Sequence, residues 1–246
     1  STFEICIDSV EGAIAAEEAG AARVELCSAL FEGGLTPSIG TIETALRAVD
    51  RIRVHVIVRP RAGDFIYSAL EIDAMERDVR AAVAAGAHGV VIGVLTAEGE
   101  VDVPATQRLI RAAGDASVTF HRAFDMVRDP FTAGGQLVEL GVDRVLTSGQ
   151  EVSVLEGAPL IAELVQRAGG RIVVMPGGGI TARNIARIIE ATKAEEYHFA
   201  ALVTSDSPAV HRNPAPLMGG SLHRSEYERS TTSAGLVGQV LAAARG

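Results

Sequence analysis

The sequence lacks most of the features that would assign it to a specialised class of protein. It holds no tryptophan and only two cysteines among 246 residues, too few for a disulfide framework. No apolar run approaches the roughly 18 residues that a membrane helix needs. The first seven residues run directly into a strand-like stretch, without the basic flank and apolar core of a signal peptide. These absences predict a cytoplasmic protein with no membrane partner.

The charge balance excludes a further class. The formal net charge is -9, and a negative field repels nucleic acid and anionic membranes, so we expect no nucleic-acid partner. The rest of the composition, 48% hydrophobic and 22% charged, is ordinary for a globular protein. The length is close to the roughly 250 residues of one (β/α)8 barrel, which predicts a single domain over residues 1–246.

What the sequence does have is a repeating pattern of strand-like and helix-like stretches. A short apolar stretch that ends in a polar residue is followed by an amphipathic helical stretch, and the pair recurs about eight times. The expected strands are residues 3–7, 23–26, 54–58, 89–93, 117–120, 144–147, 171–175 and 197–200. The expected helices are residues 10–19, 41–49, 70–85, 104–113, 131–140, 158–167, 182–191 and 234–244.

Such alternation implies parallel strands joined by right-handed crossovers. Eight units without a break in composition favour an α/β fold of the closed (β/α)8 type, the TIM barrel. The alternative is a doubly wound open sheet, but no G-x-G-x-x-G follows the first strand. Two connections, 28–40 and 201–232, are long enough to be lids or contact arms. Residues 61–69 are a third candidate cover, with Phe65 and Tyr67 as apolar tips.

Side chains alternate faces along a strand, which separates an apolar set from a polar one. In the first strand, for example, Ile5 and Ile7 share the face that must pack on helices, so Cys6 points into the barrel. The same argument gives an inward set of Cys6, Asp8, Glu25, Cys27, His55, Arg59, His121 and His198. A structural ion pair explains one or two buried charges, but a set of this size favours a functional site. Active sites of such barrels lie at the carboxyl ends of the strands.

Three kinds of chemistry fit this set. Cys6 and Cys27 lie on neighbouring strands, and two inward thiols could hold Cu(I), which prefers thiolate ligands. The alternative is that both cysteines are small buried hydrophobes. Glu25 and His121 could act as a general acid and base. A hard-metal site made by His121, Asp125 and His198 is a weaker alternative, because nearby arginines oppose a dication.

Anion binding is the third possibility. The run Gly177, Gly178, Gly179 precedes a helix that we expect Thr181 to cap, and backbone N–H groups at such a place bind anions. A tight turn that simply needs glycine is the alternative. Positive charge gathers at the expected mouth and favours a carboxylate or phosphate, unless acidic neighbours pair with it. The expected anion-binding residues are Arg59, Arg61, Arg122, Ser148, Gly177, Gly178, Gly179 and His198.

Several blocks of the sequence resemble a known family. The stretches ICIDSVEGAIAAEEAGAARVELCSAL, FEGGLTPSIGTI, HVIVRPRAGDFIYS, VTFHRAFDM, RVLTSGQ, MPGGGIT and RNPAPLMGG closely resemble the CutC family of copper homeostasis proteins. The resemblance implies a (β/α)8 barrel, a cytoplasmic location and a homo-oligomer, dimer or tetramer. It also implies copper as the ion bound, with Cys6 and Cys27 at the positions of proposed Cu(I) ligands.

One departure from the family pattern follows His198. The family usually continues with small residues, a serine and then a basic residue, whereas this chain continues FAALV, which weakens the expectation of an anion contact from that loop. Two hypotheses therefore stand. The first is a cytoplasmic copper homeostasis protein that binds Cu(I) through inward-facing cysteines. The alternative is a barrel enzyme of unknown reaction, acting at the carboxyl-end mouth on a small anionic or phosphorylated metabolite.

Overall fold

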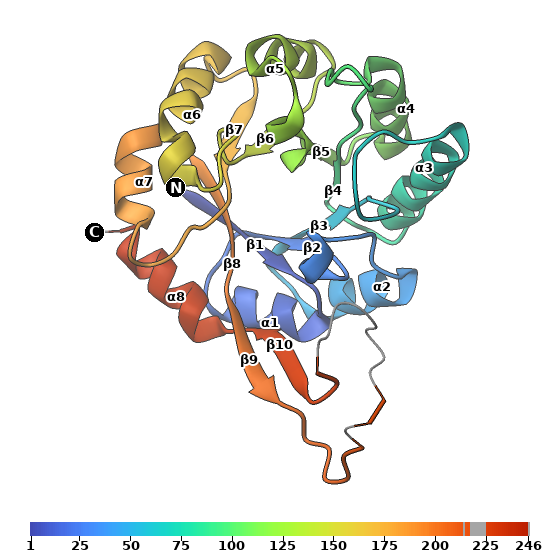
Figure 1. Ribbon diagram of the computed structural model, residues 1–246, viewed down its shortest axis with the longest axis vertical. Helices are drawn as coiled ribbons and strands as arrows, with labels where there is room; N and C mark the ends of the chain where they lie inside the picture. The colour runs from blue at the N-terminus through green and yellow to red at the C-terminus, as the bar shows by residue number, and fades with distance from the viewer. Residues whose placement is uncertain (214, 217–224, 246) are drawn as a thin grey trace.

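The computed structural model describes residues 1–213, 215–216 and 225–245, and it confirms the predicted barrel. The parallel strands are β1 (Thr2–Ile7), β2 (Arg23–Leu26), β3 (Arg53–Ile57), β4 (Gly89–Ile92), β5 (Ser117–Phe120), β6 (Arg144–Thr147), β7 (Val173–Pro176) and β8 (Glu196–Ala200). The surrounding helices are α1 (Val10–Glu18), α2 (Ile39–Ala48), α3 (Ala69–Ala84), α4 (Val103–Ala113), α5 (Pro130–Glu139), α6 (Val154–Ala168), α7 (Ile185–Thr192) and α8 (Ala234–Ala243). Figure 1 shows the helices as a ring outside the strands.

The barrel has a seam between β7 and β8. The ladder runs without interruption in the order β7-β6-β5-β4-β3-β2-β1-β8. A single parallel bridge, between Gly177 and His198, joins the two ends of this ladder. The seam therefore closes at two residues that the sequence had already placed at the mouth.

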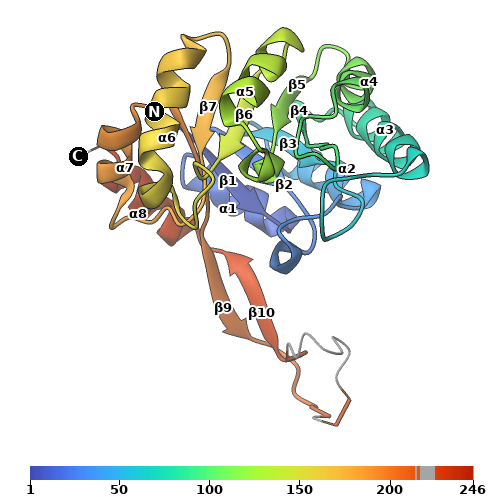
Figure 2. The ribbon, with the colours of Figure 1, turned by 45° about the horizontal axis from the view of Figure 1, so that its top comes forward.

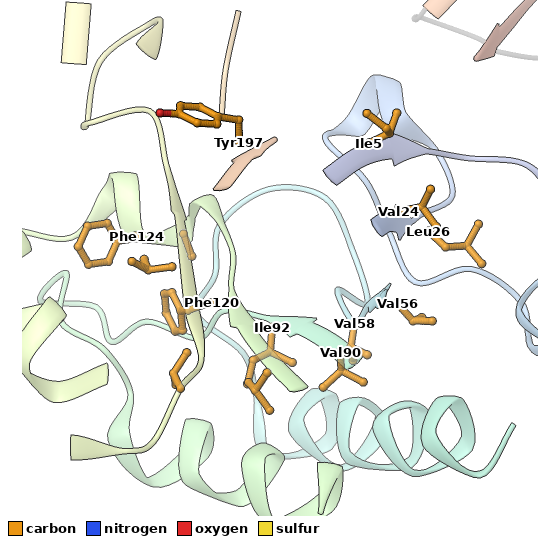
Figure 3. Close-up of a cluster of buried hydrophobic side chains, with 14 of the residues drawn as sticks. Ile5, Val24, Leu26, Val56, Val58, Val90, Ile92, Phe120, Phe124 and Tyr197 are labelled. Atoms are coloured by element: carbon orange, nitrogen blue, oxygen red, sulfur yellow. The ribbon is translucent and has the colours of Figure 1, made fainter. Parts of the chain in front are cut away.

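The predicted alternation of faces is confirmed by how the strand residues pack. Ile5, Val24 and Val56 belong to the main apolar core between strands and helices, part of which Figure 3 shows. Inside the barrel lies a separate small cluster that contains Cys27, Ile57 and Val91, with Cys6 and Leu30 packed against it. The two sets alternate along β1, β3 and β4, as the period of two requires.

Buried charges cross the floor of the barrel. Glu4 of β1 is fully buried and accepts a hydrogen bond from Nε of Arg23 on β2. Arg23 also donates to Glu196 of β8, and Nε of Arg144 on β6 donates to the same Glu196 oxygen at 2.8 Å. Acid and base thus alternate across four strands. This pairing offsets the cost of removing the four charges from water.

The prediction that Thr181 caps the seventh helix is wrong. Helix α7 begins at Ile185, with Asn184 at the N-cap position. The Asn184 side chain accepts a hydrogen bond from the Thr181 amide at 2.8 Å and donates to the Gly179 carbonyl at 2.8 Å. This pair of bonds favours a separate turn over residues 181–184. The glycine run is therefore followed by a turn, and the helix starts later.

The long connection after β8 forms an arm. Strands β9 (Leu202–Asp206) and β10 (Glu228–Thr232) pair antiparallel, and Figure 2 shows this hairpin standing away from the barrel. Part of the predicted 201–232 segment, including Met218, Gly219 and Gly220, lies outside the described residues. None of the helices in the described part of the chain is long and apolar enough to cross a membrane.

Removing the charge of Glu4 should be strongly destabilising. Glu4→Gln leaves Arg23 with Glu196 as its remaining carboxylate and removes the charged partner of His198, and breaking a buried pair in this way costs about 3–5 kcal/mol. The control is Glu163→Gln, whose exposed pair with Arg167 on α6 should contribute at most about 0.5 kcal/mol. Urea unfolding of both variants checks this. A Glu4→Gln loss no larger than that of the control contradicts it.

Candidate functional site

A cavity of about 690 Å³ opens at the carboxyl ends of the barrel strands. It lies where (β/α)8 barrels carry their active sites. The residues selected from the sequence that line it are Cys6, Glu25, Arg59, His121, Arg122, Gly177, Gly178, Gly179 and His198. Its lining does not include Cys27, Arg61, Ser148 or Asp8. The structure thus brings most of the expected set to one place.

The two thiols face each other. The Sγ atoms of Cys6 and Cys27 are 3.9 Å apart, although Cys27 is one step beyond the end of β2. The amide of Cys27 donates to the Ile7 carbonyl at 2.8 Å, which continues the ladder and fixes its height. A hydrogen bond from Cys27 lowers the pKa of Cys6 to about 6, against the opposing effect of burial. The same bond raises the pKa of Cys27 well above its usual value. The pair therefore favours one thiolate and one thiol.

Glu25 stands beside this pair. One ligand atom each of Cys6, Glu25 and Cys27 lie within 4.8 Å of one another, close enough to meet around a metal ion. Burial first, and then the negative charge of Cys6, raise the pKa of the Glu25 carboxyl to about 8. Glu25 can therefore hold or release a proton near neutral pH.

His198 lies between two carboxylates. Its Nδ1 is 2.7 Å from Oε1 of Glu4, and its Nε2 is 3.5 Å from Oε2 of Glu25. Burial opposes the charged imidazolium, but hydrogen bonds with Cys6 and Glu4 outweigh it and raise the pKa of His198 well above its usual value. Burial would likewise raise the pKa of Glu4, but His198 and Arg23 hold it well below its usual value. Glu4 therefore orients His198 from beneath.

Glu4 is not among the residues that the sequence predicts for the site. The signal was present, because Glu4 shares a strand face with Cys6 under the alternation rule. What the sequence did not reveal is that the β1–β8 register sets Glu4 directly opposite His198.

His121 ends β5 on the other side of the cavity. Its side chain is 5% exposed, and its Nδ1 accepts a hydrogen bond from the Ala123 amide at 3.1 Å. Burial first, and then the charge of Arg59, lower the pKa of His121 to about 3. The imidazole is therefore neutral, with its proton on Nε2. Two groups of side chains in the described residues are close enough to hold a metal ion, namely Cys6, Glu25 and Cys27, and Glu4, Glu25 and His198. Neither group combines His121, Asp125 and His198.

The three arginines have different surroundings. Arg59 donates to the carbonyls of Glu32 and Gly34 and to that of Gly63, so it holds two loops together at the rim. Arg61 lies outside the cavity and pairs with Asp64 and Glu71.

Arg122 is the most exposed of the three arginines. Its Nε donates to Asp125 at 2.7 Å and its Nη2 to Ser148 at 2.8 Å. Ser148 is itself buried, and its hydroxyl also contacts Asp125. Ser148 therefore does not line the cavity itself but contacts two residues that do, Arg122 and Asp125.

The glycine run forms the wall at the seam. The Gly177 amide donates to the Thr147 carbonyl at 2.9 Å, and the Gly178 carbonyl accepts from the Val154 amide at 3.0 Å. A Cβ on Gly177 would lie 2.5 Å from Leu146 and 3.2 Å from the His198 side chain. Glycine is therefore needed at 177 for β7 and β8 to meet, whatever else the run does.

Comparison with known proteins agrees with this architecture. The model of the CutC family matches residues 1–203. A "family protein CutC" of Bacteroides thetaiotaomicron is 48% identical over 94% of this chain and 93% of its own length. A human protein named "Copper homeostasis protein cutC homolog" is 51% identical over 94% of this chain and 84% of its own. The chain belongs to the CutC family.

Solved structures show the same barrel. The crystal structure of a putative copper homeostasis protein CutC from Streptococcus agalactiae has a TM-score of 0.78 and 35% identity, over 80% of this chain and 97% of that one. An N-(5'-phosphoribosyl)anthranilate isomerase from Pyrococcus furiosus has a TM-score of 0.58 and 13% identity, over 99% of this chain and 98% of that one. The second likeness shows the fold alone.

A methyl group at residue 177 should crowd the side chains of Leu146 on β6 and His198 on β8. Gly177→Ala should lower the free energy of unfolding by about 1–3 kcal/mol, because the new Cβ overlaps Leu146. Gly135→Ala is the control. Its Cβ meets nothing within 4 Å in α5, so it should stabilise by about 0.5–1 kcal/mol. Urea unfolding compares them, and equal effects of the two substitutions contradict the prediction.

Proposed function

We propose that this member of the CutC family binds Cu(I) between Cys6 and Cys27. The observation that carries the proposal is the 3.9 Å separation of the two sulfur atoms inside the barrel. An ion held by both sulfurs needs no movement of the strands. Soft thiolate ligands select Cu(I) over the hard divalent ions of the cell.

The surroundings of the thiols support this choice. Ile57, Val91 and Leu30 pack against the pair on one side and form an apolar wall there, while Glu25 and His198 lie on the other side. Cys6 also lines the open cavity, so an ion arriving from the mouth meets Cys6 first and then the more deeply buried Cys27. Glu25 is placed to supply an oxygen as a third ligand. His198 lies beside Glu25 and is oriented by Glu4, an arrangement typical of groups that position a metal ligand.

The proposal extends to the cellular location and the oligomeric state of the protein. A thiol pair that binds copper must stay reduced, which favours a cytoplasmic location. We also propose a homo-oligomer, dimer or tetramer, for which the projecting β9–β10 hairpin offers an exposed contact surface. The names of the human and mouse relatives, copper homeostasis protein homologues, agree with buffering or transfer of copper as the role of the site.

Anaerobic Cu(I) titration against a competing chromophoric chelator tests the copper proposal. The wild type should bind tightly, and the double variant Cys6→Ser, Cys27→Ser should bind about a hundredfold more weakly or not at all, because both soft ligands are gone. Met126→Leu is the matched control. It removes another sulfur donor that lines the cavity and is 66% exposed, and it should leave the affinity unchanged. Binding that is indifferent to the cysteines overturns the proposal.

A second function is favoured by the cavity itself. A space of about 690 Å³ is far larger than one metal ion requires, and it suits a small organic molecule. We propose that it holds a small anionic or phosphorylated metabolite, bound near Arg122 and the glycine run. Glu25, with its pKa raised to about 8, is suited to proton transfer on such a molecule. The two proposed sites share Glu25, while the thiols belong to the copper site alone and Arg122 with the glycine run to the second.

Inorganic phosphate is the probe for the second function. Arg122→Ala removes a cationic group from the cavity wall and should weaken phosphate binding about tenfold. Arg61→Ala is the matched control, since Arg61 is also a rim arginine but lies outside the cavity lining. Isothermal titration calorimetry measures both. Equal affinity in the two variants, or no binding by the wild type, contradicts the proposal.

A further inference from the structure

Two buried donors on one wall of the cavity have no acceptor among the described residues. They are Nε2 of His121 and Nε of Arg59. Both residues line the cavity. An unsatisfied buried donor is costly, and such atoms in native proteins call for an explanation. Here the two lie on adjacent parts of the rim, at the ends of β5 and β3.

The structure holds both side chains firmly. Nδ1 of His121 is occupied by the Ala123 amide, which directs the proton to Nε2. The ring fits against Gly93, where a Cβ would lie 2.2 Å from the imidazole. Arg59 uses both N–H groups of Nη1 and one of Nη2 on the backbone carbonyls of residues 32, 34 and 63, so Nε is its one nitrogen without a partner. The two donors are therefore fixed in place before any ligand arrives.

The side chain of Phe65 packs against both His121 and Arg59. The Phe65 ring centroid is 5.1 Å from that of His121, and the Arg59 guanidinium carbon is 5.2 Å from the same Phe65 ring. Phe65 itself is only half-buried and also lines the cavity. Its loop is exposed on either side, at Asp64 and Ile66. An apolar ring thus packs against both of the residues that carry an unpaired donor.

We propose that the His121–Arg59 wall is a carboxylate-binding site, and that Phe65 is a movable cover which a ligand's carboxylate displaces. A carboxylate has two acceptor oxygens, one for each donor, and its charge complements Arg59. A neutral imidazole N–H is a suitable donor to such an oxygen, and it needs no proton transfer to act. The ligand class is a small organic acid. The proposal rests on the second function above, whose site it specifies.

The absence of tryptophan makes the cover easy to observe. Phe65→Trp introduces a single reporter at the cover position. Pyruvate should move the indole into water and shift its emission to longer wavelength, with a saturable dependence on concentration. Acetone, which has the ketone but no carboxylate, should produce no shift. In wild-type protein, ¹⁵N-labelled on histidine, the Nε2–H signal of His121 should move on adding pyruvate, which serves as a second measurement without any substitution.

Two variants in the Phe65→Trp background test the donor. His121→Phe keeps a ring but removes the N–H, and it should weaken pyruvate binding about tenfold. His121→Gln keeps an amide donor and should bind within about threefold of its parent. Circular dichroism checks that both are folded. Unchanged affinity in His121→Phe, or a shift with acetone equal to that with pyruvate, overturns the proposal.

The outcomes separate this inference from the function on which it rests. If phosphate binding depends on Arg122 while pyruvate leaves both the indole and the His121 signal unmoved, the cavity binds anions but the His121–Arg59 wall does not. If neither phosphate nor pyruvate binds, both proposals fail. If pyruvate binds with the expected dependence on His121 and phosphate does not bind, the wall is a carboxylate site and the Arg122 proposal is wrong.

Discussion

The fully buried carboxylate of Glu4 is the constraint on which the rest of the site depends. Below it, Arg23 links β1 to β2 and, through Glu196, to β8. Above it, the same carboxylate fixes Nδ1 of His198 at 2.7 Å. One side chain therefore joins the charged floor of the barrel to the chemistry of its mouth. Because a charge in this position is tolerable only when paired, neither its position nor that of His198 can relax independently.

This coupling gives the cavity two unlike halves. On the β1, β2 and β8 side, the thiols, Glu25 and His198 form a compact cluster. Its groups can exchange protons, and its sulfur atoms can bind a soft metal ion. On the β3 and β5 side, Arg59 and a neutral His121 present fixed donors and no base. The sequence hypotheses treated Glu25 and His121 as one acid–base pair. The structure separates their properties, since burial raises the pKa of Glu25 and lowers that of His121.

The sequence predicts the barrel and its inward set well because both follow from local alternation. Strand period and helix spacing are short-range patterns, and the confirmed positions of Ile5 and Cys6 depend on nothing else. The residue at which each helix begins is harder to predict from the sequence. Helix α6 begins at Val154, earlier than expected, because Ser153 and Glu156 form a capping box. The N-cap of α7 is Asn184 and not Thr181, and residue type does not separate the two, because both are common N-cap residues. The pairing of Glu4 with His198 is set by the register of β1 and β8, which residue patterns along one segment do not encode.

The departure from the family pattern after β8 has a structural consequence for the cavity. Where a small-residue loop with a basic residue is usual, Phe199, Ala200 and Leu202 line this cavity instead, and the chain runs on into β9. Beyond His198, the wall that follows β8 is therefore apolar, while the arginine charge comes from Arg59 and Arg122 on the opposite side. A ligand that matches both walls must be amphipathic, with its anionic group toward β3 and β5.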